Sequence, residues 1–233
     1  MAKRIKFGCA IRGGGVELKT ASPTKPREVV KKDLVVLVEG KDDEKALDEL
    51  LKRHHSLGVR ALQYDIFVHP NSGPGCRVDS PNFLRSYTEQ YRFALVVFDQ
   101  EGCGAGLSPA HQLEAALRSQ LNDGDWNGRA EVVVITPELE AWVWGQSPHI
   151  EIVLGWADRT PTLRDWLVEK GWCLAGAAKP ERPKEAMAAA LRHVRKPWSS
   201  SLHSQLAAKA SWKSCEDDSF LRFQSVLRNW FSL

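Results

Sequence analysis

The sequence lacks the long apolar run that a transmembrane helix requires, and its N-terminus lacks the apolar stretch of a signal peptide. Its five cysteines are scattered and form no C-x-x-C pair, so they predict neither a zinc site nor a disulfide framework. His111, His149, His193 and His203 show no metal-ligand spacing, and no G-x-S-x-G, Walker A, G-x-G-x-x-G or H-E-x-x-H motif is present. We therefore expect a cytoplasmic protein with reduced cysteines, whose chemistry depends on other residues.

The charges of the chain are unevenly distributed along its 233 residues. Residues 1–32 carry nine Lys and Arg against two Asp and Glu, and residues 179–213 carry eight against two. The stretch 33–178 carries 13 against 22, although the net charge of the whole chain is only +3. An acidic middle between two basic segments suggests a site that attracts cations, beside surfaces that bind polyanions. Ordinary solvated surface charge is the alternative, and charge alone does not separate the two.

The hydrophobic pattern predicts alternating strands and helices in a chain that is 43% hydrophobic, enough for a sizeable core. Short apolar runs at 34–38, 62–68, 93–98 and 132–135 are typical of buried parallel strands. We expect an α/β fold with a mostly parallel central sheet of about four strands, and a C-terminal helical extension that holds most of the tryptophans. A Gly/Pro/Ser loop is expected at 69–81, and helices at 42–53, 81–90, 109–121, 137–146, 161–170, 182–195, 200–210 and 217–231.

Acidic residues follow three of the expected strands. They lie in Glu39–Glu44, in Asp99–Glu101 and in Glu138–Glu140. Because ligands of open α/β sheets bind outside the carboxyl ends of the strands, parallel strands would bring all three clusters to one edge. Asp43 and its acidic neighbours would also suit the first turn of a helix for electrostatic reasons alone, but this does not account for Glu39.

The spacing within the clusters predicts which carboxylates face the site. Asp99 and Glu101 are two apart, so in extended backbone both project to the same side. Glu138 and Glu140 would be early helix residues, and since such positions do not share a helix face, only one is expected to point at the site. Five or more carboxylates in one crevice repel one another unless a cation neutralises them. One or two Mg²⁺ or Mn²⁺ ions would suit this all-oxygen site and support phosphodiester chemistry.

Two of these segments resemble motifs of the Toprim fold. Leu37-Val38-Glu39-Gly40-Lys41-Asp42-Asp43 looks like its signature, and Val97-Phe98-Asp99-Gln100-Glu101-Gly102 falls where its second motif, Asp-x-Asp, belongs. Topoisomerases, bacterial primases, OLD-family nucleases and the ribonuclease that matures 5S ribosomal RNA share this fold. Glu138-Leu139-Glu140-Ala141-Trp142 is similar to a motif of small stand-alone Toprim-like proteins, which are often linked to mobile elements and phage defence.

The resemblance implies roles for individual residues and a division of the chain. Glu39 would be the general acid or base or a metal ligand, Asp43, Asp99 and Glu101 would be metal ligands, and Glu138 or Glu140 would complete the shell. Glu101 stands where aspartate is usual, which leaves the number of ions and the efficiency of catalysis open. We expect a basic N-terminal appendage (1–32), a Toprim-like Rossmannoid catalytic domain (33–145) and a helical, tryptophan-rich extension (146–233).

Nucleic acid is the partner that these observations imply, through its phosphates. Arg77 follows the second strand in a glycine-rich loop and would border the same crevice, although a loop without a ligand is an equal reading. The candidate phosphate contacts in the basic segments are Lys25, Arg27, Lys31, Lys32, Arg192, Arg195 and Lys196.

Two functions follow as alternatives. The first is a Mg²⁺- or Mn²⁺-dependent nuclease that acts on DNA or RNA, in a role such as phage defence. The second is a catalytically weak or inactive Toprim-like subunit that binds nucleic acid within a multi-protein defence complex. Relaxation of DNA is not expected, because Tyr64, Tyr87 and Tyr91 are the only tyrosines and none stands out as a nucleophile.

Overall fold

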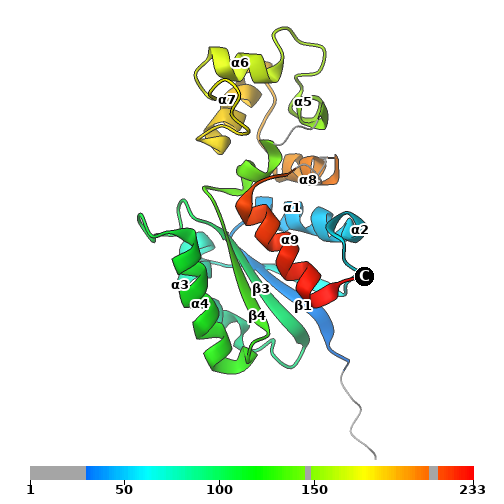
Figure 1. Ribbon diagram of the computed structural model, residues 1–233, viewed down its shortest axis with the longest axis vertical. Coiled ribbons are helices and arrows are strands. Elements are labelled where there is room, and N and C mark those ends of the chain that lie inside the picture. Colours follow the sequence, from blue (N-terminus) through cyan, green and yellow to red (C-terminus); the bar gives the residue numbers. More distant parts are fainter. Residues whose placement is uncertain (1–29, 145–147, 210–214) are drawn as a thin grey trace, which may run out of the picture.

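A single parallel sheet forms the centre of the structure, which is a computed structural model that describes residues 30–144, 148–209 and 215–233. In these residues four strands lie in the order β2-β1-β3-β4, and each neighbouring pair is parallel. Figure 1 labels three of them, β1, β3 and β4. This confirms the expected α/β fold class, with a parallel sheet and C-terminal helices, and is consistent with a Toprim-like Rossmannoid fold. The strands are β1 (Lys32–Val38), β2 (Tyr64–Val68), β3 (Tyr91–Asp99) and β4 (Ala130–Ile135).

Helices cover both faces of the sheet, which explains why its strands read as continuous apolar runs. Alternate residues of β1 point to opposite faces, so Val36 belongs to one hydrophobic core and Val35 to the other. The core on the Val36 side includes side chains of α1 (Lys41–Lys52), α2 (His54–Leu57) and α9 (Asp218–Phe231), whereas the core on the Val35 side includes those of α3 (Ser72–Arg85), α4 (Ala110–Leu121) and η1 (Asn122–Trp126).

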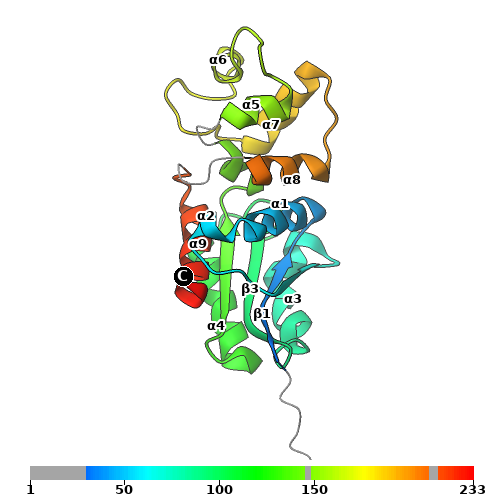
Figure 2. The ribbon, with the colours of Figure 1, turned by 90° about the vertical axis from the view of Figure 1, so that its right-hand side faces the viewer.

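The helical extension includes α5 (Pro148–Leu154), α6 (Leu163–Glu169), α7 (Pro183–Val194) and α8 (Ser200–Lys209). It contains a third core of its own, and α8 connects this core to the sheet. Leu202 and Leu206 of α8 pack in the extension, while Ala207 belongs to the core that contains α1. Figure 2 shows α8 lying along α1, with α5, α6 and α7 beyond it. Among the described helices, none combines the length and the apolarity that a membrane crossing needs. A short helix, η2 (Leu139–Trp144), follows β4 and precedes the helices of the extension.

The segment that the sequence predicted as a loop up to residue 81 is helical from Ser72 onward. Its glycines allow close approach of the helix to its neighbours instead of providing flexibility. A Cβ on Gly73 would lie 2.5 Å from Oε2 of Glu39, and one on Gly75 would lie 2.0 Å from Nδ1 of His69. The prediction of a loop was therefore wrong. The glycine and proline residues that suggested a turn belong to the tightly packed first turn of α3.

Candidate metal centre

Three strands deliver carboxylates to the same edge of the sheet. Glu39 follows β1 directly, and Asp99 is the last residue of β3. Glu138 comes shortly after β4, and Glu140 lies in η2. Asp43 is in the first turn of α1, behind Gly40, whose extended backbone lets the chain turn from strand to helix. The parallel register of the sheet thus brings together residues that are far apart in the chain.

Asp99, Glu138 and Glu140 form the centre of this cluster. Each offers a carboxylate oxygen, and these three atoms all lie within 4.8 Å of one another. The three side chains are buried, with exposed fractions of 4%, 4% and 2%. Oε2 of Glu39 accepts a hydrogen bond of 3.3 Å from the backbone N–H of Asp99. A cavity of about 230 Å³ opens onto the site, and its wall includes Glu39, Asp43, Asp99, Glu140 and Lys184.

Both Glu138 and Glu140 therefore face the site, although the sequence predicted that only one would. The prediction assumed that both residues lie in an α-helix, where positions two apart point in different directions. In the structure η2 is a 3-10 helix that begins at Leu139, so Glu138 precedes it and takes part only through its carbonyl, which accepts the N–H of Ala141 at 2.9 Å. The direction of its side chain is set instead by the backbone N–H of Lys184, which donates to Oε1 of Glu138 at 2.8 Å.

Burial makes the charged forms of these carboxylates unfavourable. Burial raises the pKa of Asp43 to about 8, and the nearby charge of Glu39 adds to the shift. Burial, followed by the charge of Asp43, raises the pKa of Asp99 well above its ordinary value. Burial also raises the pKa of Glu39 and of Glu138, although backbone N–H groups that donate to them act in the opposite direction. The metal-free site thus retains protons that exposed carboxylates would lose.

The unpaired oxygens of the cluster fit a hard divalent cation. Oδ1 of Asp43, Oδ1 of Asp99 and Oε2 of Glu140 are buried and have no hydrogen-bond partner among the described residues. A buried polar atom without a partner is unfavourable, so such atoms call for an explanation such as an ion. Carboxylate oxygens are the ligands that Mg²⁺ and Mn²⁺ prefer. The residues present therefore fit a divalent metal; the structure does not indicate which one.

Lys184, at the start of α7, is a residue of the site that the sequence did not predict. Its Nζ lies 3.7 Å from Oε2 of Glu138, and its side chain is 52% exposed. Burial alone would lower the pKa of Lys184, but the surrounding carboxylates, Glu140 first, raise it overall. The ammonium group therefore stays charged beside the cluster. Its place in a Lys- and Arg-rich stretch was a signal, but nothing in the sequence singled it out from its neighbours.

His203 is a second residue that the sequence did not assign to the site. It is 2% exposed, and its Nε2 lies 3.1 Å from Oε1 of Glu140. Its other ring nitrogen, Nδ1, lies 3.7 Å from Oδ2 of Asp42, which also accepts a hydrogen bond of 3.1 Å from the indole of Trp198. His203, in α8, thus contacts Glu140 in η2 and Asp42 in α1. Through this residue the extension helps to fix the carboxylate of Glu140.

Glu101 lies outside the group of three carboxylates. It is exposed, and its backbone N–H donates to the carbonyl of Pro137 at 3.0 Å. The expected pairing with Asp99 required extended backbone, but β3 ends at Asp99 and the chain bends at Gln100 before Gly102 takes a φ of 84°. The alternation of side chains therefore stops at Asp99. A role of Glu101 as a metal ligand stays a prediction.

The candidate phosphate contacts are spread over the molecule, and their role stays a prediction. Arg77 is held by the loop that follows β3, because its Nε donates to the carbonyl of Cys103 at 2.8 Å. Lys31 and Lys32 lie at the amino end of β1, opposite the carboxylates, where Lys32 pairs with Asp65 at 2.6 Å. At the end of α7, Arg192 and Arg195 are exposed, whereas Nζ of Lys196 donates to a backbone carbonyl. Lys25 and Arg27 lie outside the described residues.

Replacing Gly73 by alanine is expected to disturb the site without unfolding the protein. The new methyl group would lie 2.5 Å from Oε2 of Glu39, closer than such atoms approach in folded proteins, so the carboxylate must move. We expect the affinity for Mn²⁺, measured by titration calorimetry, to fall by about 10- to 100-fold, as when a group that orients a ligand is lost.

Pro74→Ala is the matched control for this variant, because Pro74 is exposed in the same turn of α3. It should bind Mn²⁺ like the wild type. Equal Mn²⁺ affinity in Gly73→Ala and wild type would show that Glu39 does not contribute to a metal centre.

The fold and the cluster together define an α/β protein with a buried acidic centre at the carboxyl edge of a parallel sheet. No protein-family model matches the chain, and the comparison with curated proteins found no match. Among solved structures, the chain is similar to the C-terminal region of the Burkholderia pseudomallei OLD protein, with 12% sequence identity and a TM-score of 0.47. The similarity covers 84% of this chain and 97% of that one.

Proposed function

We propose that this protein is a metal-dependent nuclease that hydrolyses phosphodiester bonds of DNA or RNA, with nucleic acid as its partner. The observation that carries the proposal is the cluster of Asp99, Glu138 and Glu140, buried and close together with unpaired oxygens beside it. Carboxylate-rich sites of this kind suit phosphoryl transfer, because they hold the cations that stabilise its charged transition state. The resemblance of Glu39–Asp43 to the Toprim signature supports the same reaction.

Asp99, Glu138 and Glu140 would hold the metal, with Asp43 and Glu39 next to them. When bound, a divalent ion supplies positive charge that polarises the phosphate and favours an ionised water. The backbone N–H of Lys184 and the ring of His203 hold two of these carboxylates in place, which reduces the freedom that ligation would otherwise remove. The protein therefore presents its oxygen ligands in a largely prepared arrangement.

Glu39 is the residue that we assign to proton transfer. Burial raises its pKa, which brings the group closer to the pH at which it can both accept and release a proton. It is less buried than the other carboxylates and lines the cavity, so a water molecule can reach it. Its contact with the backbone N–H of Asp99 fixes Oε2, and its other oxygen accepts no hydrogen bond from the part of the chain that the structure describes.

Lys184 is suited to hold the phosphate. Its ammonium is partly exposed and charged, and it lines the same cavity as Glu39 and Asp99. A phosphate oxygen in the cavity would therefore meet a cation supplied by the extension as well as the metal. The extension thus contributes a substrate contact in addition to the support that it gives the carboxylates.

A nuclease assay on the Glu39→Gln variant tests this proposal. The variant keeps the shape of the side chain but removes the proton acceptor, so we expect cleavage in the presence of Mg²⁺ or Mn²⁺ to slow by about 10²- to 10⁴-fold. Linear, supercoiled and single-stranded DNA and single-stranded RNA are the substrates, because the carboxylates would act on the phosphodiester bond that all of them share. The matched control is Glu44→Gln on α1, whose carboxylate pairs with Lys41 on the surface and should leave the rate unchanged.

Two results would contradict the proposal in different ways. If Glu39→Gln cuts as fast as the wild type, the assigned site is wrong. If the wild type binds these nucleic acids but cuts none of them with either metal, the binding subunit without catalysis is the better description. A role in phage defence, and partner proteins within it, are proposals that the resemblance alone supports.

A further inference from the structure

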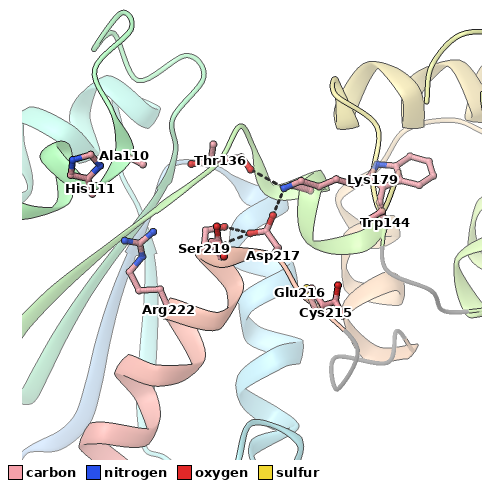
Figure 3. Close-up of a pocket in the computed structure, with 13 residues that line it drawn as sticks. Ala110, His111, Thr136, Trp144, Lys179, Cys215, Glu216, Asp217, Ser219 and Arg222 are labelled. Atoms are coloured by element: carbon pink, nitrogen blue, oxygen red, sulfur yellow. Dashed lines mark hydrogen bonds and ion pairs between the residues drawn. The ribbon is translucent and has the colours of Figure 1, made fainter. Parts of the chain in front are cut away.

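A second and larger cavity, of about 560 Å³, lies between the first residues of α4 and those of α9. Figure 3 shows His111 and Arg222 on the side of the sheet, and Lys179 and Trp144 across the cavity from them. Its volume is within the range of sites that bind small molecules or parts of larger ones, about 300–1,000 Å³. It is distinct from the cavity of the carboxylates, and the proposed chemistry does not use it.

The two cavities are immediate neighbours along two segments of the chain. Glu140 lines the carboxylate cavity and Ala141 lines the second one, and the Cα atoms of consecutive residues are about 3.8 Å apart. Lys179 lines the second cavity and Lys184 the first, so one short basic segment borders both. A strand whose phosphate lies at the carboxylates would therefore bring an adjoining nucleotide to the second cavity.

The walls of the second cavity do not suit a phosphate. Glu216 and Asp218 are exposed carboxylates in its lining, and their charge disfavours a second anion. Asp217 also lines it, and this carboxylate pairs with Lys179, which neutralises the cation. The cavity thus offers more acceptors than free positive charge.

The same walls suit a nucleobase, which has an apolar face and polar edges. Ala178, which is exposed, and the small part of Trp144 that reaches the cavity (5% exposed) supply apolar surface, and the carboxylates can accept hydrogen bonds from the amino and imino groups of a base. Arg222 supplies a fixed donor, because its Nη1 is held at 2.6 Å from Glu114, which is itself buried and accepts the backbone N–H of Val134 at 2.8 Å. Polar groups held in this way lose little freedom when a ligand binds.

We propose that the second cavity binds one unpaired nucleobase of the substrate strand, next to the phosphodiester held at the carboxylates. The inference rests on the proposed nuclease function and adds to it a preference for substrates that are single-stranded at this position. A base that enters the cavity has left the stack of a duplex, and this costs least in a strand that is already single.

The test compares strands that have bases with strands that lack them. Oligothymidylate and oligouridylate are measured against abasic strands of the same length and sugar, with Ca²⁺ in place of Mg²⁺. The wild type should bind the strands with bases at least about fivefold more tightly, the ratio that corresponds to about 1 kcal/mol for one net hydrogen bond to the base. Ala178→Trp fills the cavity from an exposed loop position and should abolish this preference while leaving the affinity for abasic strands unchanged.

Ala61→Trp is the matched control, because Ala61 is an exposed loop residue at the amino end of the sheet, away from both cavities. It should keep the preference of the wild type. Should Ala178→Trp fail to fold, Glu216→Ala removes one acceptor from the surface and should reduce the preference on its own. Equal affinity of the wild type for strands with and without bases would overturn the inference and leave the nuclease proposal intact. Absence of both binding and cleavage for every strand would instead overturn the nuclease proposal itself.

Discussion

Replacing Asp99 by asparagine is expected to abolish metal-dependent cleavage and at the same time to stabilise the metal-free protein. Asp99 is 4% exposed, and a carboxylate oxygen of Asp99 lies within 4.8 Å of one from each of Glu138 and Glu140, so Asp99 is a buried ligand of the proposed centre. An amide of the same shape binds a divalent cation poorly, and the rate should fall by more than about 100-fold, beyond the usual cost of losing an outer-shell partner.

The opposite effect on stability follows from the burial of the charge. In the metal-free protein Oδ1 of Asp99 has no hydrogen-bond partner among the described residues, and burial, followed by the charge of Asp43, raises the pKa of Asp99 so that the folded protein keeps a proton that the unfolded chain loses near neutral pH. Asparagine is neutral at every pH and so removes this cost of protonation, and we expect the free energy of unfolding in EDTA at neutral pH to rise by about 1–2 kcal/mol. In a chain of this size such a change raises the melting temperature by about 2–8 °C. Gains in stability on removal of a functional group are typical of active sites.

Calorimetric melts in EDTA and cleavage assays with Mn²⁺, carried out on the same preparations, measure both effects. Asp125→Asn is the control, since Asp125 is 53% exposed and its ion pair with Arg85 is far from the carboxylates in the sheet. It should change neither the rate nor the melting temperature appreciably. A lower melting temperature for Asp99→Asn in EDTA would show that Asp99 has a purely structural role.

The sheet and its acidic edge could be predicted from the sequence because both depend on local patterns. The run Leu34–Val38 is apolar on both faces, which only a buried parallel strand explains well, and each acidic cluster follows such a run directly. Once the strands are parallel, their carboxyl ends must meet, and the proximity of Asp99 to Glu138 and Glu140 follows. Glu101 lies outside this group, because a single bend after β3 ends the alternation of side chains, and its role as a ligand stays a prediction.

The contributions of the extension could not be predicted, because they depend on tertiary packing. Lys184 and His203 reach their carboxylates across 46 and 63 residues of chain, and neither belongs to a motif with a defined spacing. The sequence does contain one indication of a close contact at the site, Gly73. A glycine inside a helix costs about 1 kcal/mol relative to alanine, so its presence at a helix start indicates a close neighbour, which in this protein is Glu39.

The stability of the metal-free protein is expected to fall as the pH rises from about 5 to 8. The pKa of Asp43 is raised from its ordinary value of 3.8 to about 8, and the pKa values of Asp99, Glu39 and Glu138 are also raised. Between these limits the unfolded chain has lost protons that the folded chain keeps, so increasing pH favours unfolding. Each such proton changes the free energy of unfolding by about 1.4 kcal/mol per pH unit, or about 3 kcal/mol from pH 5 to pH 7 for Asp43 alone.

A bound divalent metal should reverse this dependence, because it interacts with the ionised carboxylates. The rise in melting temperature caused by millimolar Mg²⁺ or Mn²⁺ should therefore be small near pH 5 and largest near pH 8. Thermal melts across this range, in EDTA and with each metal at constant ionic strength, measure both dependences. Na⁺ at the same ionic strength controls for general screening of charge and should not reproduce the effect.

Asp43→Asn separates the contribution of the cluster from that of the other titrating groups of the protein. Asp43 is 5% exposed, and position 43 no longer titrates in the variant. The slope of the free energy of unfolding against pH in EDTA should therefore decrease by the contribution of one proton, about 1.4 kcal/mol per pH unit. The stabilisation by metal should also decrease. A melting temperature that stays constant from pH 5 to 8 in EDTA would mean that the carboxylates are not held together in the folded protein. A metal effect independent of pH would mean that the ion binds elsewhere, since binding at this centre must displace the protons that burial retains.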